Sequence, residues 1–128
     1  MLAGNLRDRI ILYNETREDA NEFSERRRKY IYAFPTRAEV SFVSGSEVMY
    51  NQMQFDSKAM KFKVRFGFSR YNEHQIIKWR DDYYNVKSID PDRRRTYLIL
   101  TAERVAKGLI RTEINQTAFP AYFYVNLM

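Results

Sequence analysis

The sequence has no cysteine, few residues that break secondary structure and no long apolar run. Its 128 residues include four glycines, three prolines and one histidine. Without cysteine there is no disulfide framework, thiol nucleophile or cysteine-ligated metal cluster. No apolar run approaches the roughly 18 residues that span a bilayer, and the N-terminal sequence lacks the apolar stretch of a signal peptide. These absences favour a cytosolic protein that does not enter a membrane.

The residues that are present are those of one folded domain. The hydrophobic share is 45%, the charged share is 30%, and the aromatic share is 16%. This length and composition predict a single globular domain. Lys and Arg exceed Asp and Glu by 22 − 16 = 6, which favours contact with a polyanion or an acidic protein surface. The alternative is a basic protein whose mixed charges are simply solvated.

Alternation of apolar and polar side chains predicts β-structure through most of the chain. The clearest case is residues 60–68, in which large apolar residues alternate with Lys61, Lys63 and Arg65. This period-two pattern is typical of an antiparallel strand with one buried face. Other strand-like runs cover residues 6–13, 30–34, 38–42, 76–80, 83–89 and 96–102. The fold class is therefore all-β: a small antiparallel β-barrel or sandwich with long loops and room for one short helix.

Breaker and polar residues predict the connections between these strands. Pro35 indicates an edge strand, a bend or a bulge. Residues 81–82 are expected to form a hairpin turn, and residues 90–92 a second turn. Residues 14–25 are strongly polar and predict a surface loop. Residues 47–55 fit either a short helix or an extended loop.

The sequence offers no catalytic constellation. His74 is the one histidine, and its polar neighbours predict a solvated position. The paired carboxylates at residues 18–19, 81–82 and 90–92 resemble loop and turn residues rather than a held acid–base pair. There is no nucleophile elbow and no phosphate-binding glycine loop. We therefore expect no catalytic residue, cofactor, metal or small-molecule substrate.

Aromatic residues near basic clusters raise a binding hypothesis. The basic clusters lie at residues 26–29 and 93–95. The aromatic residues that could stack on single-stranded bases are Tyr71, Trp79, Tyr83, Tyr84 and Tyr97. The simpler interpretation places the aromatics in the core and the cations on a solvated face or a subunit interface. Residues 60–68 favour the simpler interpretation, because their phenylalanines and their cations lie on opposite faces.

Several motifs follow one another in a familiar order. They are GNLRDRI at residues 4–10, AEV at 38–40, SGSE at 44–47, the strand of residues 61–66, Trp79 with YNV at 84–86 and ID at 89–90, and RRRTYLIL at 93–100. This order resembles that of the head–tail joining proteins (head-closure or stopper proteins) of tailed bacteriophages over residues 4–104. The chain departs from the family in Arg37, where tryptophan is usual, in its highly charged first loop and in the segment after Arg104.

The resemblance implies a small antiparallel barrel with a structural, non-enzymatic role. Copies would form a ring at the portal or its adaptor, close the DNA-filled capsid and join it to the tail. The implied partners are further copies of the chain, the portal or adaptor protein, a tail protein and, non-specifically, the packaged DNA. The implied location is the head–tail junction of the virion, and the host cytoplasm during assembly.

The same resemblance suggests site residues and a division of the chain. Candidates for the subunit or partner interface are Arg7, Arg9, Arg37 and Glu47, and candidates for contact with DNA in a channel are Lys61, Lys63 and Arg65. Residues 1–104 would form the joining domain, and residues 105–128 an extension that is either a docking arm or extra strands. The alternative function is a monomeric β-barrel that binds single-stranded nucleic acid.

Overall fold

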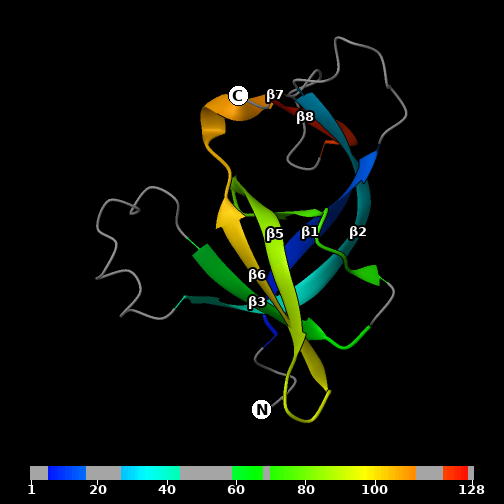
Figure 1. Ribbon diagram of the computed structural model, residues 1–128, viewed down its shortest axis with the longest axis vertical. Helices are drawn as coiled ribbons and strands as arrows, with labels where there is room; N and C mark the ends of the chain where they lie inside the picture. Colours follow the sequence, from blue (N-terminus) through cyan, green and yellow to red (C-terminus); the bar gives the residue numbers. More distant parts are fainter. Residues whose placement is uncertain (1–5, 17–26, 44–58, 68–69, 112–119, 127–128) are drawn as a thin grey trace.

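The computed structural model describes residues 6–16, 27–43, 59–67, 70–111 and 120–126. Within them the chain forms eight strands in one antiparallel sheet (Figure 1). The strands are β1 (Asp8–Thr16), β2 (Arg27–Phe42), β3 (Ala59–Arg65), β4 (Ile76–Trp79), β5 (Asp82–Pro91), β6 (Tyr97–Arg104), β7 (Ile110–Arg111) and β8 (Tyr122–Asn126). A short 3-10 helix, η5 (Lys107–Leu109), precedes β7. The all-β prediction is confirmed.

The sheet closes on itself and forms a barrel. Neighbouring strands follow the order β1–β4–β5–β6–β3–β2, and β1 also pairs with β2. The length of β2 makes this closure possible. Its 16 residues pair with β1 over residues 29–38 and with β3 over residues 39–42. Closure gives each of the six strands a hydrogen-bonded neighbour on both sides.

The predicted alternation along β3 fills the barrel. Met60, Phe62 and Val64 are buried, whereas Lys61 and Arg65 are exposed. The cluster inside the barrel, the inner core, comprises Ile10, Leu12, Ala38, Met60, Phe62, Val64, Tyr71, Ile77, Tyr84, Val86, Leu98, Leu100 and Ala102. Complete burial of one aliphatic or phenyl side chain contributes about 1.5–3 kcal/mol to stability. The inner core is therefore the main stabilising element of the barrel.

The middle of β1, residues 10–13, is buried on both faces. Ile10 and Leu12 belong to the inner core, whereas Ile11 and Tyr13 point outward into a second cluster. This outer core comprises Ile11, Tyr13, Tyr30, Ile76, Phe123 and Val125, with Tyr83, Val105, Leu109 and Ile110 packed against it. A strand covered on both faces has no solvated side, which explains the uninterrupted apolar run at residues 10–13.

The C-terminal segment covers the outer face of β1. β8 pairs with residues 27–31 of β2 on one side and with β7 on the other. The Phe123 side chain is completely buried, and its ring centroid lies 4.8 Å from that of Tyr13 and 4.5 Å from that of Tyr83. Two strands, β7 and β8, thus lie within residues 105–128, where the sequence suggested a docking arm or extra strands. The division of the chain at residue 104 stays a prediction.

A β-bulge occurs close to Pro35. Pro35 itself lies within β2, opposite Ile11. Leu12 pairs with Phe34 and Tyr13 pairs with Tyr32, so residue 33 of β2 has no partner in β1. The bulge expected at Pro35 is therefore found two residues before it. A bulge increases the local twist of a strand, which helps a short sheet to close.

Several strand boundaries differ from the sequence expectation: the β4–β5 turn lies at residues 80–81 rather than 81–82, β3 ends at Arg65, and β1 and β5 are longer than expected. Residues 14–16 were expected in a loop but extend β1, because they pair with residues 29–31 of β2. Residues 90–91 were expected in a turn but end β5, and the turn begins at Asp92. The remainder of the expected loop, residues 17–25, and the candidate helix at residues 47–55 lie outside the described residues. Within the described residues no helix is long and apolar enough to cross a membrane.

Candidate assembly and polyanion-binding surfaces

Two of the candidate interface residues lie side by side on the outside of the barrel. Arg9 of β1 is the register partner of Arg37 in β2, and both side chains are exposed. The Arg37 guanidinium also donates a 3.2 Å hydrogen bond to the carbonyl oxygen of Arg7. The structure therefore brings Arg7, Arg9 and Arg37 together, while Glu47 lies outside the described residues.

The candidate DNA contacts lie on the outward face of β3. The Lys61 and Arg65 side chains are exposed and have no ion-pair partner among the described residues. Lys63 is held in place instead: its Nζ lies 3.9 Å from Glu39 Oε1 and 5.6 Å from the centroid of the Tyr97 ring. Such a long, partly exposed ion pair adds little stability, but it orients the side chain. Lys61 and Arg65 are thus the two cations of β3 that are free to meet an anion.

The sheet register places Arg65, one of the DNA candidates, at the same end of the barrel as Arg9 and Arg37. Glu39 pairs with Lys63, and two residues beyond this pair Arg37 and Arg65 lie at the end of the β2–β3 ladder. Arg65 pairs in turn with Tyr97, the first residue of β6. The start of β1 and the β5–β6 turn lie at the lower end of the barrel in Figure 1. Sequence reasoning missed this grouping because only strand pairing brings these residues together.

The β5–β6 turn is organised by the Asp92 side chain. Its Oδ1 accepts hydrogen bonds from the backbone N–H groups of Thr96 (2.8 Å) and Tyr97 (3.2 Å). The Asp92 carbonyl oxygen accepts a further bond of 3.0 Å from the Arg95 N–H. Partial desolvation raises the pKa of the Asp92 carboxyl, but hydrogen bonds from backbone amides outweigh it and hold this pKa below its usual value. The ionised carboxylate therefore fixes the turn.

This fixed turn presents three consecutive arginines. Arg93, Arg94 and Arg95 are exposed, and their side chains have no partner among the described residues. Arg95 has a φ of 57°, in the left-handed region that favours glycine, asparagine or aspartate. An arginine in this conformation costs about 1 kcal/mol. The turn therefore carries positive charges that have no partner among the described residues. At position 95 its backbone conformation favours glycine, asparagine or aspartate over arginine.

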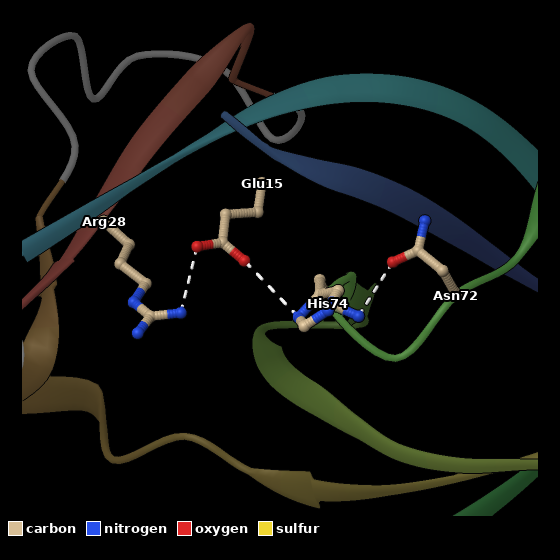
Figure 2. Close-up of polar contacts among 4 residues, drawn as sticks. All are labelled: Glu15, Arg28, Asn72 and His74. Atoms are coloured by element: carbon tan, nitrogen blue, oxygen red, sulfur yellow. Dashed lines mark hydrogen bonds and ion pairs between the residues drawn. The ribbon is translucent and has the colours of Figure 1, made fainter. Parts of the chain in front are cut away.

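An open polar pocket of about 300 Å³ is lined by Asn14, Glu15, Asn72 and His74. Glu15 lies between Arg28 and His74: its Oε2 accepts a 2.9 Å hydrogen bond from Arg28, and its Oε1 lies 3.8 Å from His74 Nδ1 (Figure 2). Asn72 Oδ1 accepts a 2.8 Å bond from the His74 N–H. The His74 side chain is 68% exposed, which agrees with a solvated histidine. None of the described lining residues is a serine, threonine or cysteine.

The aromatic residues considered for base stacking are mostly part of the two cores. Tyr71, Tyr84 and Tyr97 are 8%, 4% and 6% exposed. Trp79 is half-buried against the inner core, and Tyr83 is half-buried against the outer core. A single-strand binding surface needs exposed ring faces. Three of the five aromatic residues are therefore core residues and the other two pack against a core, which supports the core interpretation. Within the described residues no group of acidic or histidine side chains converges to hold a metal.

A second kind of exposed surface lies on β2. Ile31, Tyr32 and Phe42 are 39%, 38% and 73% exposed, although all three are large and apolar. Sequence analysis missed them because their residue types are ordinary for a strand. Exposed apolar side chains of this kind form the centres of protein–protein interfaces.

Comparison with known proteins identifies the family and the fold of the chain. The family model for the phage head completion protein matches residues 1–105. Among solved structures, the chain is similar to protein SF1141 from Shigella flexneri 2a, which is known from a solution structure. The identity is 21% and the TM-score is 0.62, and the match covers 84% of this chain and 99% of that chain. At this identity the likeness concerns the fold alone. No curated protein matches the chain.

Proposed function

Because this chain belongs to the phage head completion protein family and is a structural protein of the phage head, we propose that it acts at the head–tail junction. Copies of the chain form a ring at the portal or its adaptor, close the DNA-filled capsid and provide the surface to which the tail attaches. The partners are therefore the portal or adaptor protein, a tail protein and packaged DNA. The subunits meet these partners in the host cytoplasm during assembly.

The observation that carries this proposal is that one strand presents two unlike exposed surfaces. β2 carries the apolar side chains of Ile31 and Tyr32 and, five residues later, Arg37 beside Arg9. Five strand residues span about 17 Å, so the two surfaces are separate. A closed ring is built from heterologous contacts, in which each subunit uses two different surfaces. A two-fold dimer, in contrast, would use a single self-complementary patch.

The candidate residues receive distinct roles in this proposal. Arg7, Arg9 and Arg37, together with Glu47, contribute to the contacts between subunits or with the portal. Residues 61, 63 and 65 of β3 contact the DNA backbone as it passes, without reading its sequence. The C-terminal strands, which lie beyond the residues matched by the family model, complete the outer core of the subunit.

The test is electron microscopy of particles from an induced phage lysate that lacks the gene, beside the same lysate complemented with the unaltered chain. We expect separate tails together with heads that are full of DNA or leaking it. Complementation should restore joined particles. Normal tailed particles in the absence of the gene would contradict the proposed role, as would failure of the unaltered chain to restore joining in a lysate that makes heads and tails.

A further inference from the structure

Six exposed arginines from four separate elements occupy one end of the barrel. This arginine end comprises Arg9 of β1, Arg37 of β2, Arg65 of β3 and Arg93, Arg94 and Arg95 of the β5–β6 turn. We propose that the arginine end binds the phosphate backbone of duplex DNA, with the β5–β6 turn as its main contact. Arg9 and Arg37 add positive charge to this surface and keep their role in the contacts between subunits or with the portal. The assignment rests on the proposed function, because it names the residues with which the junction protein would hold packaged DNA.

Among the described residues, arginines outnumber carboxylates at this end, although Asp8 of β1 and Asp90 of β5 also lie there. Arg9 and Arg37 face each other in register, and like charges directly across a sheet are unfavourable. Two of the nearby carboxylates are already engaged: Asp92 accepts backbone N–H groups, and Glu39 pairs with Lys63. An external polyanion that lies across the arginines relieves their repulsion.

The turn is suited to phosphate because it is arranged before binding. Guanidinium groups form paired hydrogen bonds with phosphate oxygens. Residues 93–95 are carried on a backbone held by Asp92, so binding orders little of the main chain. Figure 1 shows the β5–β6 hairpin extending at the lower end of the barrel. Duplex DNA matches this surface with about one negative charge per 1.7 Å of its axis.

The surroundings of the turn favour DNA over an acidic protein. The centre of a protein–protein interface is rich in apolar and aromatic side chains and poor in charge. The exposed large apolar residues of the described chain are Ile31, Tyr32 and Phe42, all on β2 and none in the turn. Tyr97, which directly follows the turn, is buried, so its ring is not available for a single-stranded base to stack on. Of the three partners compared, duplex DNA, bound through its phosphate backbone, fits the surface of the turn best.

The test compares two double variants of the full chain that lose the same charge. Arg93→Gln with Arg94→Gln removes two cations of the turn that have no partner among the described residues. Lys87→Gln with Lys107→Gln removes two exposed cations elsewhere, which lie 3.8 Å from Glu103 and Asp82 respectively. Binding of each chain to a labelled duplex of about 30 base pairs is followed by fluorescence anisotropy as a function of salt.

The double variant Arg93→Gln with Arg94→Gln should bind the duplex more weakly than the unaltered chain. The slope of the logarithm of its association constant against the logarithm of the salt concentration should be smaller by about 2, because each phosphate contact contributes about 0.9. The lysine variant should leave the slope unchanged. Equal losses in both variants, no binding by the unaltered chain at low salt, or equal competition by poly-glutamate of the same total charge would each overturn the assignment. The proposed function is tested separately, by the restoration of joined particles in the lysate that lacks the gene. A failed DNA titration would therefore overturn the DNA-binding assignment and leave the proposed function standing.

Discussion

Two phenylalanines with the same burial lie in two differently built regions of this protein. Phe62 and Phe123 are both 0% exposed. Phe62 lies in the inner core, on a strand that is paired on both sides within the closed barrel. Phe123 lies in the outer core, on the five-residue strand β8, which is joined to the barrel through residues 27–31 of β2. Equal burial therefore does not mean an equal contribution to global stability, because a locally attached segment can detach while the barrel stays folded.

The largest effect is expected inside the barrel. Phe62→Ala should lower the free energy of unfolding by about 3–5 kcal/mol, because it removes a phenyl ring and leaves a cavity that a closed barrel cannot fill by relaxing. Urea denaturation followed by circular dichroism measures the change. The matched control is Lys61→Ala on the outward face of the same strand, which should change stability by less than about 0.5 kcal/mol. Similar losses in both variants would contradict the assignment of the inner core.

A smaller effect is expected for Phe123→Ala, of about 2 kcal/mol. The loss cannot exceed the free energy that docks the C-terminal segment, because beyond that point the segment detaches and the barrel keeps its remaining stability. Hydrogen exchange should accelerate selectively in the amides of β8 and β7 and stay unchanged in β3. Uniform acceleration through the whole sheet, with a loss as large as that of Phe62→Ala, would mean that the segment folds cooperatively with the barrel.

The same contrast explains how much of the fold could be predicted. Period-two alternation is a local property, so the sequence was sufficient to place β3 and its buried face. The two-sided burial of β1 is also visible, as the apolar run at residues 10–13. The segment that covers its second face could not be found locally, because Tyr13 and Pro120, which share a hydrogen bond, are 107 residues apart. The extension of β1 through residue 16 was missed for a related reason: pairing with β2 overrides the polar composition of those residues.

The candidate surfaces, too, could be predicted only as far as they depend on local sequence. Arg9, Arg37 and Arg65 could each be chosen from the sequence, but their common location depends on strand register and barrel closure. The arginines at residues 93–95 were visible as a basic cluster. Their rigid presentation was not, because it depends on the Asp92 hydrogen bonds and on a turn that begins two residues later than expected.

The smallest expected effect concerns a single hydroxyl group in the outer core. The Tyr13 hydroxyl donates a 2.9 Å hydrogen bond to the buried carbonyl oxygen of Pro120. Tyr13→Phe keeps the ring and removes this bond, so stability near neutral pH should fall by about 1 kcal/mol. Burial, with smaller contributions from Tyr83 and Tyr32, raises the pKa of Tyr13 far above its ordinary value of 10.0.

The raised pKa gives this variant a second, opposite signature at high pH. The folded chain keeps the phenol neutral, whereas the unfolded chain ionises near pH 10, so the contribution of Tyr13 is complete below pH 10 and is lost as the pH rises above it. At pH 10.5 this linkage costs the unaltered chain about 0.8 kcal/mol that Tyr13→Phe does not lose. The stability difference between the two chains, measured by urea denaturation, should therefore narrow from neutral pH to pH 10.5. A difference that stays constant would mean that Tyr13 ionises equally readily in both states and that the outer core is open to solvent.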